Sequence, residues 1–490
     1  MTLSHPDKGW SWVVLFGAFW VMFVEGTFIG TLGIIHLALL DRYDESIMKT
    51  SMAGSLFAFM NTSGGILSSI MVDRWSCRCV TVTGAFLFTI GLLICALPVS
   101  LDTITFSFGI LAGIGSSLSN TTAFIAVGYN FKQRMNIANG ISTSGIALGS
   151  LVMPPVVEIL RLHYGNIMLF LILGCLSLQQ VVMGMLYFPS FLEHTRQRRL
   201  HLEKHQQSSS VKSVCIIWLK ILENASFICF TSYLCLLQLG AFVIYLHLPT
   251  FVLTTGFTSM EASYLLTLKG TCAFLARILL AALVNSDSYN TELTTLMFGT
   301  TSFLALASIL LPFYGTSFAG LVMFCMICGF YSDSVFGILN ALNAFIVGPD
   351  NFATATGMEF AMMGIGSFVG PTLVGQVIDV GGTYTFCFSV TGGILFLAGF
   401  LSLVSGLLRT TRHRDHLRNG DQVFNMCIQD SLCKDDENLH NQTPLNSQIT
   451  TIENCSAENG SFEECQQLNQ VSTNLNHVKG FSTDSVTSLT

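Results

Sequence analysis

Charged side chains are scarce in this sequence. Asp, Glu, Lys and Arg make up 10% of its 490 residues, while 51% of the residues are hydrophobic. Soluble globular proteins carry roughly 25% charged residues, which cover the surface that faces water. The mean hydropathy of +0.61 agrees with this shortage. The composition therefore excludes an ordinary soluble protein, and lipid is expected to form part of the solvent.

Motifs for chemistry are also missing. The sequence contains no nucleotide-binding loop and no pattern for covalent catalysis, so we expect neither an enzyme nor a cofactor. Most of the 15 cysteines lie in apolar segments, and the C-x-x-C spacing of Cys325 and Cys328 has no ligand-rich surroundings. We expect these cysteines to pack rather than to hold a metal. The mild net charge of -7 gives no reason to expect a nucleic-acid partner.

Long apolar runs fill most of the chain. A helix needs about 20 apolar residues to span a bilayer, and about twelve stretches reach that length. Very short loops separate several of them, so counts of eleven or thirteen also fit. The sequence predicts an all-α membrane protein with twelve transmembrane helices. Their centres lie near Val21, Ser63, Thr89, Ile114, Gly145, Ser177, Gly240, Ala273, Ala305, Phe330, Gly366 and Phe396.

One polar connection divides the apolar runs into six plus six. Residues 189–225 contain HTRQRRLHLEKHQQSSS and separate an N-terminal half, 1–188, from a C-terminal half, 226–408. Residues 409–490 form a tail rich in Ser, Thr, Asn and Gln with few aromatic residues. Such a segment buries too little apolar surface to fold alone, so we predict a disordered tail.

The chain opens with a charged stretch that runs into two tryptophans, HPDKGWSWVV at residues 5–14. Tryptophan prefers the headgroup level of a bilayer, where its ring is buried and its N–H stays wet. Trp10 and Trp12 therefore predict the membrane boundary of the first helix. The apolar run that follows is too long for a secretory signal, and no small-residue cleavage site closes it.

Basic residues predict the orientation in the membrane. With an even number of spans, both termini lie on one side, and only Arg42, Lys49 and Arg161 fall on the other side. Because cytosolic loops are rich in Lys and Arg, we predict a multi-pass plasma-membrane protein with both termini in the cytosol. The basic residues on the predicted cytosolic side are Lys8, Arg74, Arg78, Lys132, Arg134, Arg196, Arg198, Arg199, Lys204, Lys212, Lys220, Arg409, Arg412, Arg414 and Arg418.

Two distant stretches, 138–157 and 355–374, match at a fixed offset. Gly, Ala and Val recur in any membrane helix, but shared prolines and Gly-Ser pairs at unchanged spacing favour a genuine repeat. The matched pairs are Ala138 with Ala355, Gly140 with Gly357, Gly149 with Gly366, Ser150 with Ser367, Val152 with Val369, Pro154 with Pro371 and Val157 with Val374.

The repeat has a physical meaning. Glycines four residues apart, Gly145 with Gly149 and Gly366 with Gly370, let helices pack closely, and Pro154 is expected to bend its helix, as Pro371 is in the second half. Two similar six-helix halves joined by a flexible loop are the build of an alternating-access transporter, in which the halves rock about a site near the midplane.

A few ionisable residues fall inside the predicted spans, where they are costly and usually functional. They are Glu25, Lys269, Arg277, Asp333 and Glu359.

Arg277 is the strongest candidate for substrate binding. It has no carboxylate within four residues along its helix, and its guanidinium offers a fork of donors that fits a carboxylate. The alternative is a structural ion pair with Asp333 or Glu359. Lys269 lies about two turns earlier and either faces the same cavity or pairs with Asp333. Asp333 and Glu359 are candidate counter-charges or proton carriers.

These residues and two short motifs resemble a known family. The stretch Asp7-Lys8-Gly9-Trp10-Ser11-Trp12 is similar to the helix 1 signature of the monocarboxylate transporters, an acidic residue, Gly, Gly, Trp, Gly, Trp. Lys8 and Ser11 depart from it at two glycine positions. Gly9 would allow a close approach at the membrane boundary.

A second signature of the same family leads into the fifth span. Phe131-Lys-Gln-Arg134-Met-Asn-Ile-Ala138-Asn-Gly140 is similar to its basic, then Ala-x-Gly, pattern, with Gln133 and Met135 in place of basic residues. The pair Asp73-Arg74 matches the loop 2–3 motif of the larger major facilitator superfamily, whose leading Gly is Ser69 here. At a helix end, such a pair can lock neighbouring helices through charge and end-dipole contacts.

The resemblance covers about residues 5–408 and implies the major facilitator fold, with two pseudo-symmetric six-helix halves. It implies a solute carrier for a small organic acid in which Arg277 binds the carboxylate. It also argues against proton–lactate symport, because the Asp that stands one turn earlier in those carriers is Ala273 here and their helix 1 Lys is Gly30. Members of the family can need a single-span accessory glycoprotein.

Three other functions stay open at this point. The first is a facilitator of a neutral or amine-bearing solute, in which Arg277 sits in a structural ion pair. The second is a non-transporting membrane sensor that signals through the tail. The third is a channel. The prediction that we favour is a secondary transporter of a small monocarboxylate or a related organic anion or zwitterion.

Overall fold

The computed structural model describes residues 7–43, 45–190, 193–195, 223–284, 293–332 and 352–408. Helices account for nearly all of this part of the chain. They are α1 (Ser11–Arg42), α2 (Ile47–Ser63), α3 (Gly65–Arg74), α4 (Cys77–Cys95), α5 (Leu101–Ile104), the π-helical η1 (Thr105–Ala112), α6 (Gly113–Asn130), α7 (Met135–Met185), α10 (Ala225–Thr254), α11 (Ser259–Val284), α12 (Leu293–Tyr314), α13 (Phe318–Ser332), α15 (Phe352–Asp379) and a last helix, Tyr384–Leu408.

Many of these helices are long and apolar enough to cross a bilayer. In the described residues eight pass that test, and the bent pair of α2 and α3 makes nine. The helix α7 contains two arms, because Gly165 has a φ of 77° and breaks its 51 residues. With α11 and α13, which are also helical, the elements agree with the twelve predicted spans. The prediction of an all-α membrane protein is confirmed.

The prolines inside the helices do not mark that break. Pro154 lies inside α7 and Pro371 inside α15, yet the backbone of α7 leaves helical geometry at Gly165. Bending at Pro154 and Pro371 stays a prediction.

Serine hydroxyls cap the starts of several helices. Ser46 accepts a hydrogen bond from the N–H of Lys49 at the start of α2, and Ser76 accepts one from the N–H of Cys79 at the start of α4.

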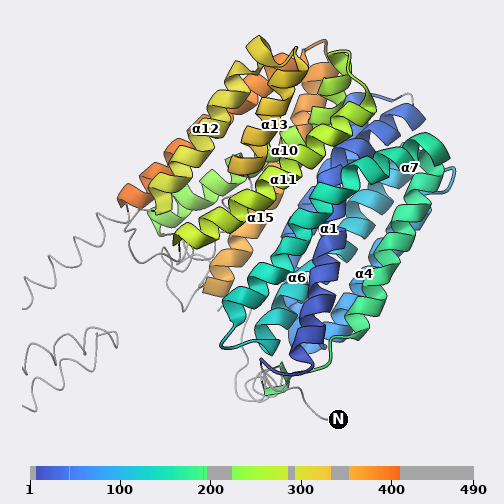
Figure 1. Cartoon of the computed structure of the whole chain (residues 1–490), viewed down its shortest axis with the longest axis vertical. Helices are drawn as coiled ribbons and strands as arrows, with labels where there is room; N and C mark the ends of the chain where they lie inside the picture. Colours follow the sequence, from blue (N-terminus) through green and yellow to red (C-terminus); the bar gives the residue numbers. More distant parts are fainter. Residues whose placement is uncertain are drawn as a thin grey trace, which may run out of the picture. The chain divides into compact units, whose positions relative to one another are not determined.

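The helices form two groups that follow the chain (Figure 1). In the first, α1 packs along α7, and α4 packs against both α6 and α7. In the second, α10 packs along α15, and α11 packs against α13. The most extensive contacts between the groups are those of α2 with α15, α11 with α7 and α1 with α10. Elements from both groups contribute to the largest apolar core.

The repeat seen in the sequence places glycines at equivalent contacts in the two groups. A Cβ built on Gly149 would lie 2.2 Å from the carbonyl oxygen of Phe23 and 2.7 Å from the nitrogen of Thr27. A Cβ on the matching Gly366 would lie 2.0 Å from the oxygen of Cys235 and 3.0 Å from the nitrogen of Leu239. Both contacts need glycine, so α7 meets α1 as α15 meets α10.

The predicted linker and tail contribute little to this description. The tail, 409–490, lies outside the described residues, and of the linker, 189–225, the structure describes 189–190, 193–195 and 223–225. The domain boundaries stay predictions.

Candidate functional site

The two short signatures of the sequence bind each other. The carboxylate of Asp7 accepts hydrogen bonds from the backbone N–H groups of Lys132, Gln133 and Arg134 at 3.2, 3.0 and 3.1 Å. The N–H of Asp7 donates to the carbonyl of Asn130 at 2.9 Å. Asp7 therefore supplies acceptors to the loop that starts α7, where helix N–H groups lack partners. We call this end of the bundle, where α1 begins, the near end.

The contact also sets the charge of Asp7. Hydrogen bonds from the N–H groups of Gln133, Arg134 and Lys132 lower the pKa of the Asp7 carboxyl below its ordinary value, because they stabilise the ionised form. Asp7 has a φ of 63° and Gly9 a φ of 53°. Gly9 adopts this left-handed conformation without strain, and no atom of a neighbouring described element lies within 4 Å of a Cβ built on it. The turn that aims Asp7 at the loop, and not the predicted close approach, therefore accounts for this glycine.

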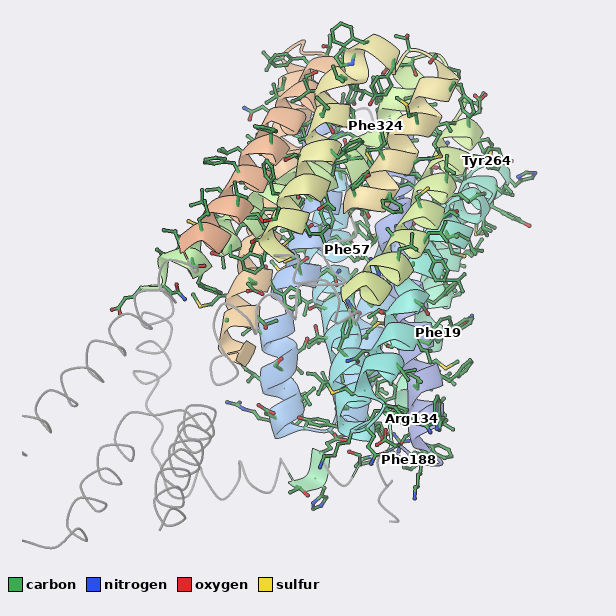
Figure 2. The ribbon with its side chains drawn as sticks, turned by 60° about the vertical axis from the view of Figure 1, so that its left-hand side comes forward. Phe19, Phe57, Arg134, Phe188, Tyr264 and Phe324 are labelled. Atoms are coloured by element: carbon green, nitrogen blue, oxygen red, sulfur yellow. The ribbon has the colours of Figure 1, made fainter. Side chains whose placement is uncertain are left out.

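The two tryptophans lie at the same end and stay partly exposed, at 41% for Trp10 and 42% for Trp12. The indole N–H of Trp10 donates to the carbonyl of Leu186 at 2.9 Å, and its ring meets Phe188 edge to face. Trp12 meets Phe131 in the same way. Figure 2 labels Arg134 and Phe188 at this end of the bundle. The rings thus tie the start of α1 to the end of α6 and to the segment that follows α7.

The loop 2–3 motif lies at the near end as well. Asp73 and the exposed Arg74 close α3. The residue that caps the next helix was not among the predicted site residues: buried Glu193 accepts from the N–H of Cys77, the first residue of α4, at 2.8 Å. An acidic residue just after the sixth span was the signal for it. Around Gly140, in contrast, no atom of a neighbouring described element lies within 4 Å of a Cβ built on it.

A small cavity lies where the two groups meet. Its walls come from α1, α7, α10 and α11, and its volume is about 10 Å³, measured as the space open to the centre of a water molecule. A single water needs about that much space, so no organic acid fits between these described residues unless the halves move apart. The lining residues are Gly30, Ser150, Tyr245, Leu266, Lys269, Gly270 and Ala273.

Lys269 is the charged residue of this lining. It is 3% exposed, and its ammonium lies 2.7 Å from the centre of the Tyr245 ring. A cation over an aromatic face is stabilised most when both are removed from water. Tyr245 was not predicted as a site residue, since an aromatic residue in an apolar span gives no distinctive signal.

Arg277 continues the same face of α11. Lys269, Ala273 and Arg277 are spaced by four residues, which places them along one side of a helix, and the first two line the cavity. Arg277 is partly buried and lies one turn beyond Ala273, on the side of the near end. Glu359, on α15, is fully buried. Asp333 lies outside the described residues, so its predicted role is untested.

The opposite end of the bundle, which we call the far end, is closed by contacts between the two groups. The carboxylate of Asp379, at the end of α15, accepts from the N–H groups of Ile47 and Met48 at 2.8 Å each. A carboxylate at a helix N-terminus satisfies free donors and complements the helix dipole. Nearby, a Cβ on Gly375 would lie 2.7 Å from the Ser51 hydroxyl, so α2 and α15 touch here.

Two buried histidines join α1 to α10 towards the far end. The rings of His36 and His247 meet edge to face with centres 5.3 Å apart, and His247 Nε2 lies 2.9 Å from the carbonyl oxygen of Pro371. A Cβ on Gly33 would lie 2.7 Å from the Pro249 ring. The two groups are therefore in direct contact from the cavity to the far end.

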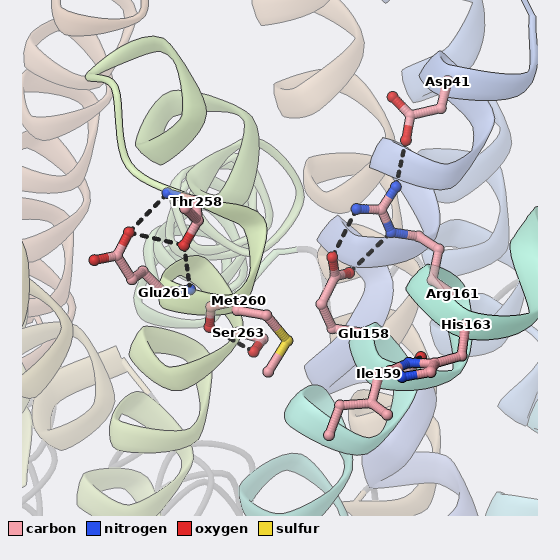
Figure 3. A network of polar contacts seen from close by, with 9 residues as sticks. All are labelled: Asp41, Glu158, Ile159, Arg161, His163, Thr258, Met260, Glu261 and Ser263. Atoms are coloured by element: carbon pink, nitrogen blue, oxygen red, sulfur yellow. Dashed lines mark hydrogen bonds and ion pairs between the residues drawn. The ribbon is translucent and has the colours of Figure 1, made fainter.

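A buried ion network supports the far end of the first group. The guanidinium of Arg161 lies between Glu158, which it contacts at 2.6 and 2.9 Å, and Asp41 (Figure 3). Glu158 is fully buried and Asp41 is half exposed. On α11, Glu261 caps its own helix through Thr258 instead.

Comparison with known proteins identifies the family. The sequence profile described as Major Facilitator Superfamily matches residues 14–358. The chain belongs to the major facilitator superfamily. The predicted superfamily and fold class are confirmed, and the roles of the individual helix 1 and loop motif residues stay predictions.

Named relatives refine the placement. The chain is 25% identical to monocarboxylate transporter 4 of Gallus gallus over 390 residues, which cover 80% of this chain and 81% of the relative. It is 26% identical to monocarboxylate transporter 13 of Bos taurus over 410 residues, 83% and 91% of the two chains. The chain is thus a divergent relative of the monocarboxylate transporters.

Solved structures support the fold alone. A peptide transporter of the POT type in complex with sulfate aligns with a TM-score of 0.66 at 13% identity, covering 83% of this chain and 98% of that one. A POT family transporter in complex with 5-aminolevulinic acid aligns with a TM-score of 0.62 at 16% identity, covering 82% and 98%. The family match and the named relatives, in contrast, show that the protein is a multi-pass membrane protein and a secondary transporter of small organic solutes rather than an enzyme.

Proposed function

We propose that the protein moves a small monocarboxylate, or a related organic anion or zwitterion, across the plasma membrane by alternating access. The observation that carries this proposal is the cationic face of α11, where Lys269 lines the closed cavity and Arg277 follows two turns later. Two cations on one helix face, in a chain with 10% charged residues, favour an anionic solute.

Each cation has its own role in this proposal. Arg277 lies on the near-end side of Lys269, so it meets a solute first when the halves part at the near end. Its planar fork binds both carboxylate oxygens. Lys269, held over Tyr245, holds a compact positive charge deeper in the cavity. Glu359 and Asp333 are proposed as the acidic partners that occupy these cations when no solute is bound.

The closed far end supports the alternating-access part. The contacts of Asp379 with α2 and of His36 with His247 bury the interface at that end, so solute reaches the far side only when they separate. The near end, where basic residues gather, is proposed to face the cytosol. A single-span accessory glycoprotein is proposed as a trafficking partner, on the resemblance to the monocarboxylate transporters.

An Arg277→Lys variant tests the assignment. Uptake of an organic acid that a metabolite screen identifies should fall at least about tenfold, because losing one of two charge-assisted bonds removes about 1.5 kcal/mol or more. Surface expression should persist. The control is Arg42→Lys. The native Arg42 guanidinium donates to the carbonyls of Cys95 and Leu97 within the first group. Unchanged uptake in Arg277→Lys would favour a neutral or amine-bearing solute instead.

A further inference from the structure

Glu25 is a buried carboxylate that the proposed solute site does not use. It lies on α1 with 1% of its surface exposed. Its Oε1 accepts from the amide nitrogen of Asn61, on α2, at 2.5 Å. The hydroxyl of Ser116, on α6, donates to its Oε2. All three residues belong to the first group of helices, so the contacts persist when the two groups move as bodies.

Both hydrogen-bond partners are uncharged, and no described basic side chain forms an ion pair with Glu25. Of the helices packed on α1, α2 and α6 contribute the amide and the hydroxyl. The helix α7 approaches at Gly26 with the backbone of Ile146. The helices α10 and α11 bring Tyr245 and Lys269 to Gly30, five residues farther along α1.

A second buried carboxylate in this chain, that of Glu158, has a basic partner. Glu158 is also fully buried, and both of its oxygens contact the Arg161 guanidinium. Removing an ionised carboxylate from water is unfavourable unless a cation and hydrogen bonds compensate. Glu158 has that compensation among the described residues and Glu25 has neutral donors, so a bound proton is the natural way to neutralise Glu25.

The contacts of Glu25 fit both protonation states. As a carboxylate it accepts from Asn61 and from the Ser116 hydroxyl. As a carboxylic acid it still accepts from Asn61, and its own O–H donates to Ser116, because a serine hydroxyl can either donate or accept. A proton can therefore bind and leave without moving any helix of the first group.

Polar atoms without hydrogen-bond partners continue from this cluster. The buried side-chain oxygens of Asn61, Ser117 and Asn120 have none among the described residues. Ser117 and Asn120 follow Ser116 along α6 towards the near end, and water in such polar surroundings is a normal part of membrane-protein interiors. They offer a route for a proton between Glu25 and the near end.

We propose that Glu25 is the proton-binding carboxyl of this carrier, and that Asn61 and Ser116 are positioning residues that hold it in both states. A proton from water binds Glu25 when the carrier is open on one side and leaves to water on the other, so solute movement is coupled to a proton. The proposal rests on the transport function above, and it supplies a proton site in a chain that has Ala273 where the related proton-coupled carriers have Asp.

The first test uses the proton itself as the ligand. The full-length protein in liposomes is titrated by infrared difference spectroscopy, following the C=O stretch of protonated carboxylic acids. The wild type should show a band that disappears as the pH rises, and Glu25→Gln should lack it. Glu25→Asp should keep a shifted band, and Glu158→Gln should leave the Glu25 band unchanged. An identical titration in wild type and Glu25→Gln would overturn the proposal.

The second test separates coupling from transport, with radiolabelled pyruvate as the probe. A one-unit pH gradient, coupled one to one, supports about tenfold accumulation in the wild type. Glu25→Gln should accumulate no pyruvate but still exchange it across the membrane at equal pH. Acid-driven accumulation by Glu25→Gln, or accumulation driven by Na⁺ alone in the wild type, would refute proton coupling through Glu25. Absence of pyruvate exchange in the wild type would count against the proposed function, and the infrared titration would still decide the proton site.

Discussion

Removing the Asp379 carboxylate should make the far end open more often. In the closed arrangement this carboxylate accepts from the N–H groups of Ile47 and Met48 at 2.8 Å, and α2 and α15 belong to opposite halves. When the halves part, Asp379 returns to water and the start of α2 loses its acceptor. Asp379→Ala therefore removes an interaction that exists in one of the two states, which is the condition for shifting a population.

The size of the shift follows from the contact. Replacing a side-chain acceptor at a helix N-terminus by Ala costs about 0.5–2 kcal/mol, and the lower half of this range applies because Asp379 is exposed and screened by salt. A loss of about 1 kcal/mol changes the ratio of closed to open protein about fivefold, since 1.4 kcal/mol corresponds to tenfold.

A reporter cysteine at Ser51 measures this ratio. Ser51 is fully buried beneath Gly375, so a membrane-impermeant maleimide added at the far end reacts with Ser51→Cys only after the halves separate. In a background without the native cysteines, Asp379→Ala should raise the labelling rate about fivefold.

The matched control is Glu261→Ala. Glu261 is also an exposed carboxylate that caps a helix, but its partner Thr258 starts the same helix, α11. The labelling rate at Ser51→Cys should not change in this variant. An equal increase in both variants would indicate that the whole far end is destabilised. No increase in Asp379→Ala would refute the far-end latch, by which we mean the contact of the Asp379 carboxylate with the N–H groups of Ile47 and Met48.

Two further predictions concern the first half. Gly149→Val should lower the free energy of unfolding by about 1–3 kcal/mol, the usual cost of overpacking, because its Cβ would collide with the backbone at Phe23. Gly140→Val should leave the free energy of unfolding unchanged, because no atom of a neighbouring described element lies within 4 Å of a Cβ at that position. Thermal unfolding in detergent compares the two variants. The lowered pKa of Asp7 means that its contact stabilises the folded state above the ordinary value of 3.8 and is lost as the pH falls through the lowered folded value. Asp7→Asn should remove that part of the pH dependence of the melting temperature, and an unchanged pH dependence would refute the role of the carboxylate.

The sequence predicted the near end better than the far end. Asp7, Trp10 and Trp12 stand in a short ordered motif, which is recognisable in the sequence although Lys8 and Ser11 depart from it. The contact with residues 132–134 could not be predicted, since it depends on backbone N–H groups that any residue supplies. The repeat was predictable because glycine is required wherever two helix backbones touch.

The far-end latch escaped prediction for a physical reason. Asp379 ends an apolar run and is followed by Val-Gly-Gly, which resembles an ordinary solvated helix end. Its partners are the backbone of residues 47 and 48, more than 300 positions away, and no sequence pattern marks such a pairing. Glu25, unlike Asp379, could be recognised from the sequence as a single carboxylate in an apolar span. That its partners are the uncharged side chains of Asn61 and Ser116 follows only from the packing of α2 and α6.

The most direct test of the account is a counterflow measurement in liposomes that contain the purified protein. Vesicles are loaded with an unlabelled small carboxylate and diluted into the labelled acid at a low concentration. An alternating-access carrier predicts a transient accumulation of label above its external concentration, because each return of the binding site brings an outside molecule in. Entry that only approaches equilibrium, unaffected by the acid inside, would contradict a carrier and indicate a channel or no transport at all.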